Sequence, residues 1–202
     1  MLKIYHVPGT RSLRVIWLCE ELGLDYEAIT VDFSTEWRMR PEWLAMNPVG
    51  KVPVMTDGDL KLFESGAMVQ YILGHYGNGR LEPVHNTRDH ALFLQWCWFA
   101  EATFARPLGE IVNHRRALDE AHQSEVAISE MQDRAWLCVK AVDEALASCD
   151  YLVANEFTAA DIMTGYSIFL VTRFVPRELP THIGAYWERI SARPAWQRAL
   201  AQ

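Results

Sequence analysis

Polar side chains cluster at the start of two segments that have the pattern of helices. Thr10, Arg11 and Ser12 open the first helical segment, and Glu64 and Ser65 open another. The free N–H groups and the dipole of a helix N-terminus favour an anion, and a hydroxyl there is equally typical of a helix cap. The residue types therefore predict a cap, an anion site, or both together, at each helix start.

A proline interrupts a strand pattern between these two places. Val52, Val54 and Met55 have strand character, but Pro53 has no N–H to donate to a neighbouring strand. Taken alone, the pattern is compatible with a trans proline where an edge strand begins. Lys51 directly precedes this edge and brings a cation to it.

The elements that must position these residues alternate between strand and helix in the first part of the chain. The pattern predicts, in order, a strand at 2–6, a helix over 11–22 ended by Gly23, a strand at 26–31, hairpin strands at 52–56 and 60–63, and a helix capped by Ser65. A strand–helix–strand unit implies a parallel pair with a right-handed crossover, and the hairpin adds an antiparallel edge. We therefore expect an α/β domain of order βαβ-ββα over residues 1–78.

Strand patterns end after the turn-rich segment 77–87, and the rest of the chain reads as helices. The pattern predicts an aromatic-rich helix kinked near Pro107, an amphipathic helix from Ser124, a helix opened by the capping box of Thr158 and Asp161, and a short last helix with Pro194 in its first turn. We expect an all-helical domain over residues 86–202, in which Asp161 serves folding and not catalysis.

Composition and charge limit the classes of protein that this chain can be. It has 202 residues, 50% hydrophobic and 22% charged, which is ordinary for a globular protein of one large or two small domains. A net charge of −7 argues against a nucleic-acid partner, because binding phosphates needs a basic surface. No apolar run approaches the roughly 20 residues that a membrane-spanning helix needs. The start lacks a signal peptide's apolar core. The four cysteines form no C-x-x-C pair and no metal-ligand spacing, so we expect reduced thiols, a cytoplasmic location and no metal.

Five stretches of the chain, in this order, resemble the glutathione transferase superfamily over essentially the whole length: "VPGTRSLRV" (7–15), "NPVGKVPV" (47–54), "FESGAMVQYI" (63–72), "FTAADIM" (157–163) and "RPAWQRAL" (193–200). The resemblance is to cytosolic, bacterial-like members of the serine or threonine type. It implies a thioredoxin-like N-terminal domain that binds glutathione, a C-terminal helical bundle domain, and a homodimer. It also implies a detoxification enzyme that uses glutathione as co-substrate and needs no metal.

The resemblance also assigns the residues that dock glutathione. Pro53 matches a cis proline that turns the Val52 backbone outward, where it pairs with the cysteinyl backbone of glutathione like an added strand. Ser65 and the helix start around it match the site of the γ-glutamyl carboxylate, and Glu64 could pair with the ammonium group. Lys51 could pair with the glycyl carboxylate.

The chemistry of this family uses glutathione as its thiolate, because the thiolate is the nucleophile. A thiol with a pKa of about 8.5 is only about 3% ionised at pH 7, and lowering that pKa by about two units requires about 2.7 kcal/mol. One hydrogen bond to the thiolate, together with a helix N-terminus, can supply that amount. Ser12 ranks narrowly ahead of Thr10 as the donor because the match around "SLRV" is longer. Arg11 could replace or support the hydroxyl by its charge, and Tyr5 in the first strand ranks third.

The acceptor pocket is expected between the two domains, with Phe104, Arg106 and His114 of the kinked helix as candidates. The leading interpretation is a transferase that conjugates glutathione to a small hydrophobic electrophile. Alternatives are a glutathione-dependent isomerase, dehalogenase or peroxidase on the same fold, or a non-catalytic binding protein. No cysteine stands at the start of the first helix, which argues against disulfide exchange.

Overall fold

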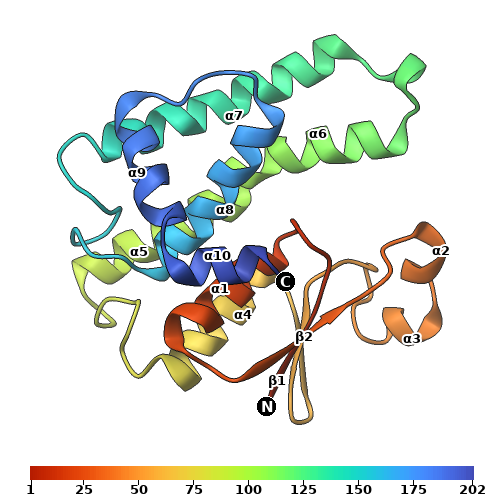
Figure 1. The fold of residues 1–202 in the computed structure, drawn as a ribbon, viewed down its shortest axis with the longest axis horizontal. Helices are drawn as coiled ribbons and strands as arrows, with labels where there is room; N and C mark the ends of the chain where they lie inside the picture. The colour runs from red at the N-terminus through yellow and green to blue at the C-terminus, as the bar shows by residue number, and fades with distance from the viewer. The chain divides into compact units, whose positions relative to one another are not determined.

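The computed structural model describes residues 1–202 as two compact units (Figure 1). The first unit contains Met1–Glu82 together with Ala192–Gln202, and the second contains Pro83–Ser191. The C-terminal segment therefore belongs with the N-terminal unit, whereas the sequence pattern grouped it with the helices before it. None of the helices combines the length and the apolarity that crossing a membrane requires.

A four-stranded mixed sheet forms the centre of the first unit. Its strands are β1 (Leu2–His6), β2 (Tyr26–Thr30), β3 (Val54–Asp57) and β4 (Leu60–Phe63), in the spatial order β2-β1-β3-β4. β1 runs parallel to β2 and antiparallel to β3, which pairs antiparallel with β4. The α/β class, the order βαβ-ββα and the mixed sheet are confirmed. β3 begins at Val54 and not at residue 52, because Pro53 cannot donate to the ladder.

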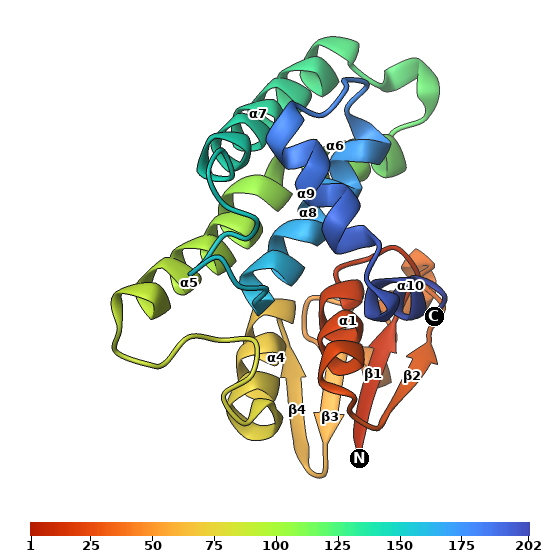
Figure 2. The ribbon, with the colours of Figure 1, turned by 60° about the vertical axis from the view of Figure 1, so that its left-hand side comes forward.

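Helices α1 (Ser12–Leu22) and α4 (Ser65–Ile72) cover one face of this sheet (Figure 2). The residues of α1 that pack inward include Val15, Ile16 and Leu18, all fully buried. α1 ends at Gly23, whose φ of 65° lies in the left-handed region that glycine adopts without strain. A π-helical turn over Leu73–Gly77 continues α4.

The last helix, α10 (Pro194–Leu200), packs on α1 within the first unit. The rings of Trp17 and Trp196 lie 4.7 Å apart, and both are buried. Arg193 donates to both carboxylate oxygens of Glu21, at 2.6 and 2.7 Å. This two-pronged contact between a guanidinium and a carboxylate is the geometry in which arginine pairs most strongly.

Two short helices, α2 (Thr35–Arg38) and α3 (Pro41–Leu44), follow β2 (Figure 1). Side chains alternate along a strand, so Tyr5 points away from the face on which Ile4 is buried. The Tyr5 ring lies 6.1 Å from that of Trp43 in α3. α3 therefore packs on the face of the sheet opposite to α1 and α4.

The second unit is entirely helical. Its helices are α5 (Arg88–Trp98), α6 (Ala105–Ala117), α7 (Glu125–Ala145), α8 (Ala159–Phe174) and α9 (Thr181–Ser191). α8 is its centre, with every residue from 159 to 171 buried. The predicted capping box of Thr158 and Asp161 is confirmed. Asp161 also accepts hydrogen bonds from the Tyr186 hydroxyl at 2.8 Å and the Leu152 N–H at 3.2 Å, which supports its structural role.

The irregularity that the sequence predicted near Pro107 takes the form of a π-helical turn over Phe99–Phe104, between α5 and α6. Pro107 itself lies in the first turn of α6, where its missing N–H frees a carbonyl in the preceding turn. The Ala100 carbonyl within the π-helical turn accepts a hydrogen bond from the Ser167 hydroxyl at 3.1 Å. The turn is therefore held by α8.

Candidate functional site

The turn between β1 and α1 brings the two predicted hydroxyls together. The Thr10 hydroxyl donates to the Val7 carbonyl at 2.8 Å, and the Oγ atoms of Thr10 and Ser12 lie 2.8 Å apart. Ser12 Oγ also lies 3.3 Å from the same Val7 carbonyl. Thr10, Ser12 and the Val7 carbonyl therefore form one small hydrogen-bonded group at the start of α1.

The two hydroxyls differ in burial. Ser12 has no exposed surface, whereas Thr10 is half-buried. Neither hydroxyl caps the helix, because the N-cap position of α1 is Arg11 and its side chain makes no capping hydrogen bond. The N–H groups of the first turn of α1 thus have no side-chain cap, and of the two residues only Thr10 keeps exposed surface.

The Val52–Pro53 bond is cis, as the resemblance implies. Val52 precedes β3 and belongs to no pair of the β ladder, so its backbone lies at a free end of the sheet. Asn47, which is buried, holds the loop before it by donating to the Lys51 carbonyl at 2.9 Å and accepting from the Val49 N–H at 3.1 Å. The Lys51 side chain itself is exposed.

Arg38 and Gly50 fix the same loop from its other side. The Arg38 Nε donates to the Gly50 carbonyl at 2.7 Å. Gly50 has φ 60°, and a Cβ at this position would lie 2.8 Å from the Arg38 carbonyl oxygen. None of Arg38, Asn47 and Gly50 was identified from the sequence. The usable signal was the glycine directly before Lys51 and the docking strand.

Glu64 lies between β4 and α4, and Ser65 is the first residue of α4. The expectation that Ser65 caps this helix is wrong: Ser65 is the first helical residue, Glu64 holds the N-cap position, and no side chain caps the helix. Glu64 has φ 77°, a conformation that costs energy for a residue with a side chain and that recurs at ligand sites. Glu64 is exposed and Ser65 is 3% exposed.

A buried arginine reaches this second helix start from α1. Arg14 has no exposed surface, and its Nη1 donates to the Ser65 Oγ at 3.3 Å. From the sequence, Arg14 had no assigned role, although its place among the apolar residues of a helix face was a visible signal. Arg14 brings a positive charge behind the place where an anion is expected.

The other candidates for the thiolate have different surroundings. Tyr5 packs its ring on Trp43, on the sheet face away from α1. All four cysteines are free thiols, and Cys19 and Cys97 are buried as expected. Burial raises the pKa of Cys19 to about 12 and that of Cys138 to about 11, so neither thiol is activated. No group of three or more His, Cys, Asp or Glu side chains is arranged to hold a metal ion.

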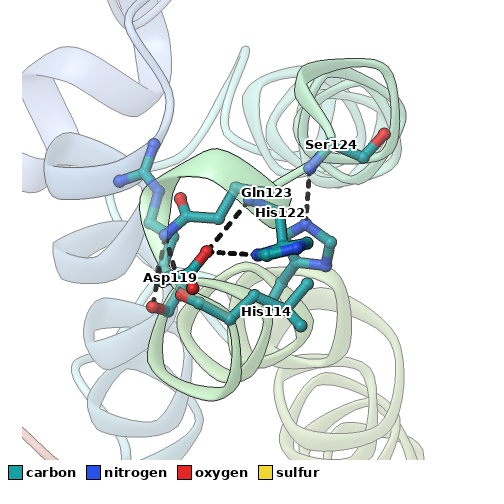
Figure 3. Close-up of polar contacts among 7 residues, drawn as sticks. His114, Asp119, His122, Gln123 and Ser124 are labelled. Atoms are coloured by element: carbon teal, nitrogen blue, oxygen red, sulfur yellow. Dashed lines mark hydrogen bonds and ion pairs between the residues drawn. The ribbon is translucent and has the colours of Figure 1, made fainter.

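No hydrogen bond, ion pair or ring contact joins the three acceptor candidates of the helical unit to one another. Phe104 is fully buried, with its ring 6.1 Å from that of Phe99. Arg106 is exposed and pairs with Glu110 at 3.1 Å. Figure 3 shows that His114 faces the start of α7, where its Nε2 accepts the Ser124 N–H at 2.9 Å. Each side chain therefore has its own surroundings, and no shared cluster joins them.

Comparison with known proteins agrees with this geometry. The family model for the glutathione S-transferase N-terminal domain matches residues 1–74, and that for the C-terminal domain matches residues 110–194. Glutathione S-transferase 3 of Zea mays is 34% identical, over 99% of this chain and 93% of the relative. A theta class glutathione S-transferase from Xanthomonas axonopodis pv. citri, solved with glutathione bound, has a TM-score of 0.85 and 29% identity, covering 100% of this chain and 97% of that one. Glutathione S-transferase III in apo form has a TM-score of 0.83 and 29% identity, covering 99% and 95%.

Proposed function

Because the chain belongs to the glutathione transferase superfamily, we propose that it conjugates the glutathione thiolate to a small hydrophobic electrophile. The observation that carries this proposal is the hydroxyl pair of Thr10 and Ser12, with oxygens 2.8 Å apart in the turn before α1. The hydroxyl of a partly exposed residue, next to an uncapped helix start, supports hydrogen-bond donation to a thiolate.

Thr10 is the proposed donor and Ser12 its positioning residue. A hydroxyl carries one hydrogen, so when Thr10 donates to sulfur it leaves the Val7 carbonyl. Ser12 Oγ is close enough to donate either to that carbonyl or to Thr10 Oγ. A bond from Ser12 to Thr10 strengthens Thr10 as a donor, because chains of hydrogen bonds polarise one another. Arg11, at the N-cap position of α1, adds positive charge beside them.

The remainder of glutathione is proposed to bind along the edge that starts at the cis proline. The Val52 backbone before Pro53 is free to pair with the cysteinyl backbone. Ser65 and the N–H groups at the start of α4 suit the γ-glutamyl carboxylate, with Glu64 for its ammonium group and Lys51 for the glycyl carboxylate. The glutathione bound to the Xanthomonas relative supports this ligand.

Several finer expectations belong to the same proposal. Phe104, Arg106 and His114 are proposed to contribute to the acceptor site, a homodimer is proposed as the working form, and detoxification in the cytoplasm as the role. The family resemblance supports the dimer and the role, whereas the three acceptor residues rest on their place in the segment expected to line the acceptor pocket. Size-exclusion chromatography with light scattering tests the dimer, and Arg106→Ala tests the acceptor site through KM for the electrophile at saturating glutathione.

The thiolate mechanism is tested by the ultraviolet absorbance of glutathione thiolate, titrated against pH with and without saturating protein. We expect the thiol pKa to fall by about two units on binding. Thr10→Val removes the hydroxyl and keeps the shape, so it should return the pKa of the bound thiol most of the way to that of free glutathione. Ser12→Ala should return it part of the way. Thr172→Val, which removes an exposed hydroxyl in α8, is the matched control.

Product analysis separates the proposed reaction from its rivals. With an aryl chloride, conjugation forms a carbon–sulfur bond to the ring and releases chloride, whereas an isomerase leaves glutathione unchanged. Glutathione that binds with an unshifted thiol pKa would contradict the thiolate mechanism and favour a non-catalytic binding protein.

A further inference from the structure

A pocket lies on the face of the sheet opposite to α1 and α4. It has a volume of about 510 Å³, within the range of small-molecule sites. Its walls include Tyr5 of β1, Trp37 of α2 and Trp43 of α3, and its rim carries Arg40 and Glu42. Tyr5, which ranked third among the thiolate donors, is part of this wall, but none of the residues proposed above to hold glutathione lines the pocket, so the proposed function leaves it without a role.

The walls of this pocket are aromatic. The rings of Trp37 and Trp43 lie 4.6 Å apart with their planes at 42°, and the ring of Tyr5 meets that of Trp43 edge-on at 6.1 Å. Because the three rings lie at different angles, a further ring could meet one of them edge-on and stack in an offset manner on another. These are the two arrangements that aromatic rings prefer. The pocket therefore suits one planar aromatic group.

The rim of the pocket carries one charge of each sign. Arg40 and Glu42 are both exposed, and neither forms an ion pair with the other or with any further side chain. Hydrogen bonds from Ser34 hold the pKa of the Asp32 carboxyl below its usual range, and the charge of Arg40 adds a smaller effect in the same direction. A ligand with a carboxylate and an ammonium group side by side complements this rim better than a simple anion or cation does, because each charge meets its opposite.

One wall residue also has an unmet hydrogen bond. Trp43 is 5% exposed, and its indole N–H is buried without an acceptor. Buried donors in native proteins are nearly always paired, and an exception calls for a ligand or another explanation. An oxygen atom of a bound ligand would provide the acceptor that the chain itself lacks.

We propose that this pocket binds an aromatic α-amino acid, with the ring among Tyr5, Trp37 and Trp43, the carboxylate at Arg40 and the ammonium group at Glu42. The site is separate from the glutathione site and does not depend on the proposed reaction. It gives the N-terminal unit a second small-molecule ligand.

The test is ¹⁹F NMR of 4-fluoro-L-phenylalanine titrated with the full chain. Two comparison probes each lack one charge: 3-(4-fluorophenyl)propanoate has no ammonium group, and 2-(4-fluorophenyl)ethylamine has no carboxylate. We expect the amino acid to bind at least about fivefold more tightly than either comparison probe, because each loses one charge-assisted contact. Arg40→Gln should make the amino acid bind no more tightly than the amine. Glu42→Gln should make it bind no more tightly than the propanoate.

Trp37→Leu should weaken all three probes, because it removes a wall of the pocket. Trp98→Leu is its matched control, since Trp98 is 67% exposed and belongs to the helical unit. Excess S-methylglutathione should leave the probes bound. The proposal would be overturned if the three probes bound equally, or if Trp98→Leu weakened them as much as Trp37→Leu. Displacement of the probes by S-methylglutathione would also overturn it, because it would assign the pocket to the glutathione site. Circular dichroism checks that each variant is folded, and Arg40 and Glu42, being exposed, can be changed without disturbing the core.

Discussion

The guanidinium of Arg14 donates to the hydroxyl oxygen of Ser65, so a residue of α1 sets the direction of a hydroxyl at the start of α4. Both side chains are buried. Since the Ser65 oxygen accepts from Arg14, its own hydrogen is free to point elsewhere, as a hydrogen bond to a carboxylate requires. Arg14 is therefore placed to favour the proposed carboxylate both through Ser65 and through its own charge.

Replacing Arg14 should therefore weaken glutathione binding without touching the thiol. Methionine has a volume similar to that of arginine but no charge. For Arg14→Met we expect KM for glutathione to rise about tenfold, while kcat and the pKa of the bound thiol change little. Ser65→Ala should show a similar loss, and the double variant should lose less than the sum of the two. These losses are measured by steady-state kinetics with glutathione and with cysteinylglycine, which lacks the γ-glutamyl group. Equal losses for both thiols would show that Arg14 serves the fold and not the carboxylate site.

Gly50 should tolerate no side chain. In Gly50→Ala the new Cβ would meet the Arg38 carbonyl oxygen at 2.8 Å, and the φ of 60° is unfavourable for alanine. We expect a loss of about 1–2 kcal/mol in the free energy of unfolding, together with weaker glutathione binding as the loop before Pro53 shifts. Gly74→Ala is the control, because a Cβ there has no neighbour within 4 Å. Urea unfolding and calorimetric titration with glutathione measure both effects, and equal behaviour of the two variants would refute the prediction.

Asp57 should make the first unit sensitive to acid. Hydrogen bonds from Tyr76 and Tyr71 hold the pKa of Asp57 below its usual range. A lowered pKa in the folded state contributes stability above the unfolded value of about 3.9, and that stability is lost as pH falls through the folded value. We expect Asp57→Asn to cost about 1 kcal/mol at pH 7 and less at about pH 3, below the unfolded value, because the carboxyl of the parent becomes protonated as the pH falls. Thermal unfolding measured at both pH values tests this, with Asp133→Asn as an exposed control.

Asp161 should be required for folding of the helical unit. It is fully buried and accepts bonds from Thr158, Leu152 and Tyr186, while burial raises its pKa. Asp161→Asn replaces an oxygen acceptor by an NH₂ group that faces these donors, and we expect a loss of about 2–4 kcal/mol in the free energy of unfolding. Urea unfolding checks the size of the loss. If the variant is as stable as the parent but catalytically dead, Asp161 has a role in the reaction that this structure does not support.

Local spacing in the sequence predicts the elements well, because each depends on neighbours along the chain. The hairpin of β3 and β4, the end of α1 at Gly23 and the capping box at Thr158 follow from residues that contact each other within a few positions. The cis bond at Pro53 required the family resemblance, since strand pattern alone favours trans.

Features that depend on distant residues were not predictable in the same way. The burial of Arg14 against Ser65 joins positions 51 residues apart, and helical periodicity does not show what a residue packs against. The backbone at Glu64 moves the start of α4 by one residue, and nothing in the side-chain pattern shows a positive φ at a glutamate. The docking of α10 on α1 depends on the pairing of Glu21 with Arg193, at opposite ends of the sequence.

That docking makes the helical unit an insertion within the α/β unit, and this has a consequence for synthesis. Residues 83–191 leave the ribosome before residues 192–202, which complete the first unit. The helical unit therefore has all its residues available while α1 still lacks its partner helix, with Trp17 uncovered. The N-terminal unit is translated first and completed last, so its folding during translation ends only when α10 arrives.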